Sequence, residues 1–176
     1  MTGVQTCALP ISLREKLGDK TGLAKSLRNL AIVQAEQGKR DEAEKTLTRA
    51  AGLLESLGDR ASIADLYNDR GVVAEEAGDF AEALKYYRQA YGLRQQLDNA
   101  TAIAESLNNI GFASYRMGDF DNASVYWKQA MDQYKQLGDH NGILHIQQSI
   151  GLLDIARGQF AKARKDLIDS DRKSVV

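Results

Sequence analysis

Apolar and polar positions along the chain follow one another with helical spacing. Between residues 103 and 114, Ile103, Leu107 and Ile110 recur at intervals of four and three. Side chains at that spacing share one face of an α-helix, so this segment is predicted to be an amphipathic helix. Gly118 then ends the pattern, because glycine tolerates the left-handed backbone of a helix C-terminus. A second stripe of the same kind follows at Phe120, Ala123, Trp127, Ala130, Tyr134 and Leu137.

This two-helix pattern repeats every 40 residues. A glycine column comprises Gly38, Gly78, Gly118 and Gly158, and an alanine column comprises Ala43, Ala83, Ala123 and Ala163. A further column of small residues comprises Ala31, Gly71, Gly111 and Gly151. Because one hairpin cannot bury its own stripe, repeated hairpins must stack. The sequence therefore predicts an all-α solenoid of about four antiparallel helix hairpins, with units at about 20–59, 60–99, 100–139 and an incomplete 140–170.

Local signals support these units. Gly111 and Ala123 are predicted where the two helices of a hairpin cross closely, and Ala130 where the next hairpin stacks, since a bulky residue would force the backbones apart. Side chains able to cap helix N-termini precede the helices at Asp19, Asp59, Asp79, Asn99, Asp119 and Asp139. Arg70 stands where the other units carry Leu30, Ile110 and Ile150. The second unit is therefore expected either to pack loosely or to use an ion pair.

The repeat resembles the tetratricopeptide repeat. The positions that carry the resemblance are Gly71, Gly78, Phe80, Ala83, Tyr87 and Ala90, and again Gly111, Gly118, Phe120, Ala123, Trp127 and Ala130. The spacing is longer than the usual period of about 34 residues. It is similar to that of kinesin light chains, of spindle-orientation proteins and of many bacterial signalling proteins. The resemblance covers residues 13–170 and implies a right-handed α-solenoid.

The two ends of the chain do not fit the repeat. Residues 1–11 read MTGVQTCALPI and residues 171–176 read DRKSVV, and both strings match translated sequencing adapters. We predict that these ends are adapter-derived and that residues 12–170 are a fragment of a larger protein. The chain's single cysteine and single proline both lie in the first end, at Cys7 and Pro10, so no thiolate metal site is expected in the repeats.

Composition excludes several classes of function. The formal net charge is −1, so no basic field is present to hold nucleic acid, and no apolar run approaches the ~20 residues of a membrane helix. The two histidines, His140 and His145, lie five residues apart, on divergent faces of a helix. Glu75 and Glu76 are adjacent and diverge, and no phosphate-binding loop is present. We expect no metal, no cofactor and no catalysis, and a cytoplasmic protein.

The resemblance implies a concave groove lined by the first helix of each hairpin. The groove residues it predicts are Lys25, Arg28, Asn68, Asn108, Phe112, Tyr115, Arg116, His145 and Gln148. Further groove positions fall on Ile32, Asp65, Val72, Glu75, Glu76, Glu105, Leu152 and Ile155.

One register of this groove holds Asn68, Asn108 and Gln148, with Arg28 as its first member. Amides both donate to and accept from a peptide backbone, so this column suits an extended segment. The alternative is a polar column that only solvates an exposed face.

Aromatic residues and arginine dominate binding energy in interfaces. Phe112, Tyr115 and Arg116 are therefore the predicted anchor for a ligand. The alternative for Tyr115 is that it packs between units.

The function predicted from these features is a protein-interaction module that holds a peptide or helix of a partner in the groove. One alternative is a sensor or regulatory segment of a bacterial signalling protein, such as a transcription regulator, a cyclase or a histidine kinase. Another is a non-catalytic part of an enzyme whose active site lies outside this chain.

Overall fold

The computed structural model describes residues 11–159 and residue 168 of the chain. Within this part, the regular secondary structure is α-helical, as predicted. Ala163, the second half of the fourth predicted unit, and nearly all of the two adapter-like ends lie outside the described residues.

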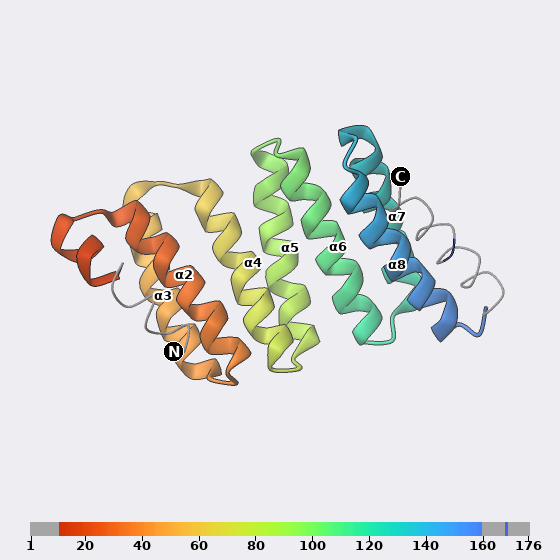
Figure 1. The fold of residues 1–176 in the computed structure, drawn as a ribbon, viewed down its shortest axis with the longest axis horizontal. Coiled ribbons are helices and arrows are strands. Elements are labelled where there is room, and N and C mark those ends of the chain that lie inside the picture. The colour runs from red at the N-terminus through yellow and green to blue at the C-terminus, as the bar shows by residue number, and fades with distance from the viewer. Residues whose placement is uncertain (1–10, 160–167, 169–176) are drawn as a thin grey trace. The chain divides into compact units, whose positions relative to one another are not determined.

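The helices divide between two compact units, and the boundary along the chain follows Leu97 (Figure 1). The N-terminal unit contains α2 (Lys20–Glu36), α3 (Arg40–Leu57), α4 (Arg60–Glu76) and α5 (Phe80–Gln96). The C-terminal unit contains α6 (Ala100–Arg116), α7 (Phe120–Leu137) and α8 (His140–Ala156).

Successive helices pair as hairpins. Helix α2 packs on α3, α4 on α5 and α6 on α7, and these three pairs are called hairpins 1, 2 and 3 below. Inside the N-terminal unit, α4 also packs on both helices of hairpin 1, and inside the C-terminal unit α8 packs on both helices of hairpin 3. The predicted all-α class of stacked antiparallel hairpins is confirmed.

The predicted caps are formed. The side chains of Asp19, Asp59, Asp79, Asn99, Asp119 and Asp139 each accept a hydrogen bond from the backbone N–H three residues later. Helix α3 differs, because Lys39 precedes it and makes no side-chain cap. A missing cap of this kind costs about 1 kcal/mol of helix stability.

Most turns between helices use a left-handed residue. Gly38, Gly78, Gly118 and Gly158 follow the first helices with φ between 73° and 78°. The turn before α6 is unusual, since Asp98 has a φ of 53° at the position that Gly18, Gly58 and Gly138 occupy elsewhere. The backbone of a non-glycine residue is strained at such a positive φ, although aspartate tolerates it better than most residues.

Each hairpin closes around one small residue of its first helix. A Cβ atom added to Gly111 would lie 2.6 Å from Cδ1 of Trp127, and Gly71 lies against the ring of Tyr87 in the same way. In hairpin 1 the small residue is Ala31, which shares a core cluster with Leu47. The first-helix residue is thus smaller where the second-helix residue is larger. The predicted close crossing at Gly111 is confirmed, and Ala43, Ala83, Ala123 and Ala130 are all 0% exposed.

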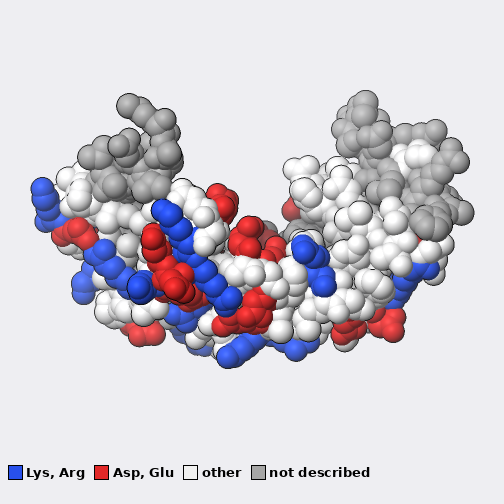
Figure 2. Space-filling model, turned by 90° about the horizontal axis from the view of Figure 1, so that it is seen from below, with Lys and Arg blue, Asp and Glu red and all other residues white. Residues whose placement is uncertain are grey.

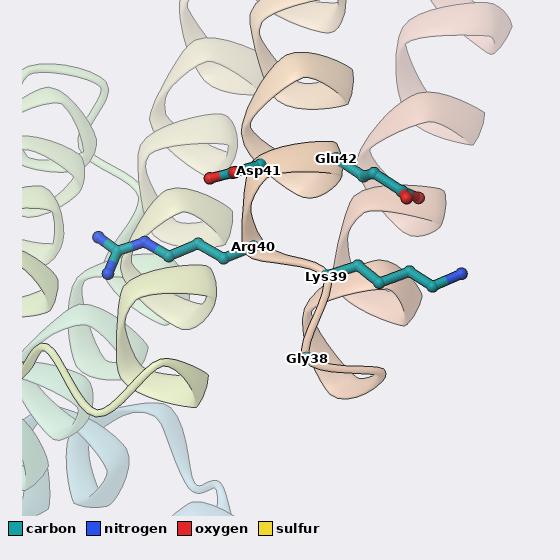
Figure 3. Close-up of a pocket in the computed structure, with 5 residues that line it drawn as sticks. All are labelled: Gly38, Lys39, Arg40, Asp41 and Glu42. Carbon is teal, nitrogen blue, oxygen red and sulfur yellow. The ribbon is translucent and has the colours of Figure 1, made fainter.

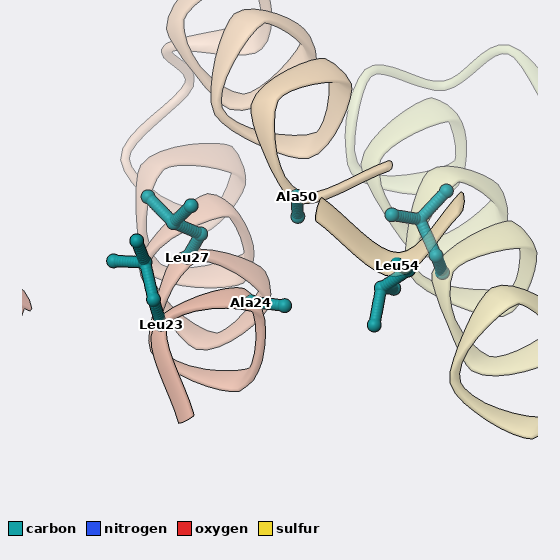
Figure 4. Close-up of a cluster of buried hydrophobic side chains, with 6 residues drawn as sticks. Leu23, Ala24, Leu27, Ala50 and Leu54 are labelled. Atoms are coloured by element: carbon teal, nitrogen blue, oxygen red, sulfur yellow. The ribbon is translucent and has the colours of Figure 1, made fainter. Parts of the chain in front are cut away.

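Hairpin 2 stacks on hairpin 1 by inserting a leucine between its helices. Leu66 of α4 is 2% exposed and joins a cluster with Leu23, Ala24, Leu27, Ala50 and Leu54 of hairpin 1 (Figure 4). Burying one leucine contributes about 1.5–3 kcal/mol. This cluster therefore holds the N-terminal unit together at the place where hairpin 2 meets hairpin 1.

Arg70 uses the ion pair expected as one of its alternatives. Its Nε lies 3.8 Å from Oε2 of Glu44 on α3, and its Nη2 donates to Thr48 at 3.4 Å. The guanidinium also lies 5.8 Å from the ring centre of Tyr86 on α5. A charged residue thus joins three helices at a position that is apolar in the other repeats.

We predict that Gly111→Ala lowers the free energy of unfolding by about 1–2 kcal/mol, because the new methyl group overlaps Trp127. The matched control is Gly52→Ala in α3, where an added Cβ meets nothing within 4 Å. That change should stabilise the chain by about 0.5–1 kcal/mol, since alanine is the better helix former. Urea unfolding followed by circular dichroism measures both changes.

A Trp127→Leu background reproduces the pairing of Ala31 with Leu47. Gly111→Ala should lower the free energy of unfolding clearly less in that background than in the original chain. An equal cost in both backgrounds would show that the ring does not limit residue 111.

Candidate functional site

The predicted groove residues all lie on first helices. Lys25 and Arg28 are on α2, Asn68 is on α4, Asn108, Phe112, Tyr115 and Arg116 are on α6, and His145 and Gln148 are on α8. The first-helix face is described for each unit by itself. The N-terminal face comprises Lys25, Arg28, Asp65, Asn68, Val72, Glu75 and Glu76, and the C-terminal face comprises Asn108, Phe112, Arg116, His145, Gln148, Leu152 and Ile155.

Arg28 lies between two carboxylates of α4. Its Nε donates to Oδ2 of Asp69 at 2.5 Å and its Nη1 donates to Oδ2 of Asp65 at 3.3 Å. The other oxygen of Asp65 accepts a hydrogen bond from Nη2 of Arg94, on α5, at 3.0 Å. Arg28, predicted as the first member of the polar column, is therefore held in an ion-pair network of four residues. Two of its members, Asp69 and Arg94, were not among the predicted site residues.

Burial sets the protonation behaviour of this network. Asp69 has a pKa above its ordinary value of 3.8, because desolvation outweighs the hydrogen bond and charge of Arg28. Asp59, the cap of α4, has a pKa below 3.8, because the backbone and the hydroxyl of Ser62 donate to it. The pKa values of Asp59, the cap of α4, and of Asp69, within α4, are thus shifted in opposite directions by different causes.

Glu75 accepts a hydrogen bond from a core residue of hairpin 2. The hydroxyl of Tyr87 donates to Oε2 of Glu75 at 2.8 Å, and Tyr87 is only 1% exposed. Burial and the neighbouring Glu75 raise the pKa of Tyr87 far above its usual range, so it stays a donor. Glu76 beside it is exposed. The N-terminal face therefore carries one fixed and one solvated carboxylate at the end of α4.

Tyr115 packs inside its own hairpin. Its ring lies 5.7 Å from the ring of Phe120 and 5.8 Å from that of Trp127, centre to centre. Tyr115 itself is half-buried. These contacts place Tyr115 in an aromatic cluster that supports α6, and its use as a ligand anchor stays a prediction.

The remaining C-terminal face combines apolar surface with polar side chains. The Arg116 guanidinium lies 5.7 Å from the ring centre of half-buried Phe112. On α8, His145 and Gln148 are exposed, and Leu152 and Ile155 are 50% and 40% exposed. Phe112 follows Asn108 by one helical turn, as Leu152 follows Gln148. The face thus repeats an amide followed by an apolar side chain on each helix.

Charge is distributed differently over the two units. Figure 2 shows Lys and Arg side chains interspersed with Asp and Glu over the N-terminal unit, on the left, and a broad uncharged area over the C-terminal unit. Mixed charge of this kind gives little net field.

A depression at the turn between α2 and α3 does not contain the predicted groove residues. It has a volume of about 270 Å³ and is lined by Gly38, Lys39, Arg40, Asp41 and Glu42 at the turn between α2 and α3. Lys39 and Glu42 point away from Arg40 and Asp41 (Figure 3), and Arg40 pairs with Glu82 and Asp79 of hairpin 2. These side chains diverge, so they do not form a site for one ligand.

Two features of the described residues bear on other functions. None of the helices in this part is both long and apolar enough to span a bilayer. The same residues contain no group of three or more histidine, cysteine, aspartate or glutamate side chains arranged to hold a metal ion.

The stacked hairpins and their first-helix faces define a helical-repeat protein of the solenoid class. The family model for the tetratricopeptide repeat matches residues 22–96 and 102–169. The chain belongs to the tetratricopeptide repeat family. No curated protein matches it.

Solved structures share this fold at low sequence identity. BtubC from P. vanneervenii is 22% identical with a TM-score of 0.75, and the match covers 96% of this chain and 78% of that one. A signal transduction ATPase with a tetratricopeptide repeat sensor from Pyrococcus horikoshii is 15% identical with a TM-score of 0.77, over 86% of this chain and 24% of that one. A Rap protein complexed with competence and sporulation factor is 16% identical with a TM-score of 0.73, over 97% of this chain and 55% of that one.

We predict that Asp59 and Asp69 titrate on opposite sides of pH 3.8. The lowered pKa of Asp59 means that its contribution to stability is present above the unfolded pKa and is lost as the pH falls through the folded pKa. The raised pKa of Asp69 has the opposite sign, so its contribution is present at low pH and is lost as the pH rises through the folded pKa.

NMR titration of the carboxyl carbons measures both values, with Asp69→Asn assigning the higher one. A measured pKa of Asp69 below that of Asp59 would contradict the stated causes.

Proposed function

We propose that the chain is a protein-interaction module that binds a segment of a partner polypeptide on its first-helix faces. The observation that carries this proposal is the pairing of an amide with an apolar side chain one turn later on both α6 and α8. An amide pairs with the backbone of an extended segment whatever its sequence. An adjacent apolar side chain supplies the contact area from which most binding energy comes.

The packing of hairpins 2 and 3 supports the assignment to first helices. The bulky core residues of the second helices, Tyr87 and Trp127, hydrogen-bond to Glu75 and to the backbone oxygen of Asn108. Both acceptors lie at groove positions of the first helices. The face is thereby held rigid before any partner binds, which lowers the entropic cost of binding.

A regulatory role inside a larger protein is a second proposal. It draws support from one likeness, since the ATPase from Pyrococcus horikoshii is described as having a tetratricopeptide repeat sensor and this chain covers 24% of it. In that role the same face would hold an effector or another segment of the larger protein. That the chain is non-catalytic, that it does not bind nucleic acid or membranes directly and that it is cytoplasmic stay predictions from its composition.

The test begins with selection of random displayed peptides on the immobilised full chain. We predict that Asn68→Ala combined with Asn108→Ala abolishes capture of the selected peptides while the helical circular dichroism is unchanged. Phe112→Ala alone should weaken binding about tenfold, the effect expected when a central aromatic contact is removed. Fluorescence polarisation of a labelled peptide measures the dissociation constants.

The matched control is Val125→Ala on α7, an apolar side chain that is 49% exposed on a second helix. It should leave the affinity unchanged. Unaltered binding by the double asparagine variant would exclude the amide column as the peptide site.

A further inference from the structure

Two rows of side chains cross the first helices of the C-terminal unit. Asn108 is followed one turn later by Phe112 on α6, and Gln148 is followed in the same way by Leu152 on α8. Asn108 and Phe112 are half-buried, and Gln148 and Leu152 are exposed. Helices α6 and α8 pack on one another. The amides therefore form one row from helix to helix, and the apolar side chains form a second row beside it.

Helix packing sets the spacing within each row. The axes of packed helices lie about 8–10 Å apart, so a segment that crosses α6 and α8 meets a new amide and a new apolar side chain at about this interval. A β-strand places side chains on one face about every 6.6 Å or 13 Å, two or four residues apart. A polyproline II helix has three residues per turn and rises about 3.1 Å per residue, so it places a side chain on one face about every 9 Å. The polyproline II helix therefore matches the spacing of the rows.

The amide row favours this conformation over an α-helix of the partner. An α-helix presents the same face again after about seven residues, or 10.5 Å, but its backbone groups are already bonded to one another. A polyproline II segment has no internal hydrogen bonds, so its carbonyl oxygens are open. The side-chain NH2 groups of Asn108 and Gln148 can donate to these oxygens, which proline carries as other residues do.

The two rows lie in an uncharged band. On α6 no charged residue stands between Glu105 and Arg116, and the one carboxylate of α8, Asp154, is only 2% exposed. Figure 2 shows the broad uncharged area over the C-terminal unit. A charged segment would lose water from its charges over this band without gaining a partner of opposite sign. A segment of proline and aliphatic residues has no such charges, so the band is complementary to it.

The N-terminal unit carries an incomplete version of these rows. Asn68 and Val72 of α4 occupy the same register as Asn108 and Phe112. On α2, however, the amide is replaced by Arg28, which is bound to carboxylates of α4. The uninterrupted amide row therefore belongs to the C-terminal unit.

We propose that the first helices of the C-terminal unit bind an uncharged, proline-rich segment of the partner in the polyproline II conformation, with an aliphatic side chain at every third residue. This deepens the proposed function, on which it rests. The aliphatic side chains contact Phe112 and Leu152, and Asn108 and Gln148 donate to the carbonyl oxygens between them. Because the segment already has this conformation when it is free, binding loses little conformational entropy.

The test compares two capped, fluorescein-labelled nonapeptides of identical composition, three leucines and six prolines. One repeats Leu-Pro-Pro three times, and the other reads Pro-Pro-Leu-Pro-Leu-Pro-Leu-Pro-Pro, in which no two leucines are three residues apart. Fluorescence polarisation with the full chain should give the first peptide a dissociation constant about tenfold lower, because two of its leucines reach Phe112 and Leu152 together. A repeat of Leu-Gly-Gly keeps the spacing without the preformed conformation, and it should bind more weakly than Leu-Pro-Pro.

Variants of the chain locate the binding. Leu152→Ala removes a half-exposed side chain and should cancel the advantage of the Leu-Pro-Pro peptide while the helical circular dichroism is unchanged. Gln148→Leu removes the amide donor and should weaken the same peptide. The matched control is Val72→Ala on α4, in the register of Phe112 but in the other unit, and it should leave the affinity unchanged.

Equal affinity of the two proline-containing nonapeptides, or an advantage of Leu-Pro-Pro that survives Leu152→Ala, would overturn the proposal. Displayed peptides that are selected without a proline-aliphatic repeat, together with no binding of the Leu-Pro-Pro peptide, reject this inference and leave the proposed function standing. An absence of selected peptides together with no binding of the nonapeptide rejects both.

Discussion

The close crossing of two helices inside each hairpin is the constraint on which the other features depend. A single small residue on the first helix, Gly71 or Gly111, allows the ring of Tyr87 or Trp127 to lie against the helix backbone. The crossing fixes which side of each first helix is buried. The opposite side, with the amide and apolar side chains of α4 and α6, is thereby turned outward in hairpins 2 and 3.

The same rings also connect the core with the outward face. Tyr87 fills the crossing of hairpin 2 and donates to Glu75, and Trp127 fills that of hairpin 3 and donates to the backbone of Asn108. A buried tyrosine or tryptophan needs a partner for its polar atom. Here that need is met at a groove position, so packing and preorganisation of the face have one physical origin.

Periodicity was sufficient to predict the helices, the caps and the crossing at Gly111, because each depends on residues that recur in one register. Arg70 departs from its register, and its ion pair was one of two alternatives that this departure left open. The pairing of Arg28 with Asp69 and of Asp65 with Arg94 was not predicted. Those pairs depend on how one helix is offset from its neighbour, and their separations of 41 and 29 residues do not match the repeat period. An acidic residue one position beyond the register of Arg28 was the available signal. The contacts of Tyr115 with Phe120 and Trp127 of its own hairpin were not predicted either, because they depend on side-chain orientation rather than on register.

The central claim is that first helices, and not second helices, carry the binding surface. Photo-crosslinking tests it most directly: a selected peptide carries a photoreactive residue at each position in turn, and mass spectrometry locates the attachment sites on the full chain. The account predicts attachment to α2, α4, α6 and α8. Attachment mainly to α3, α5 and α7 would contradict it.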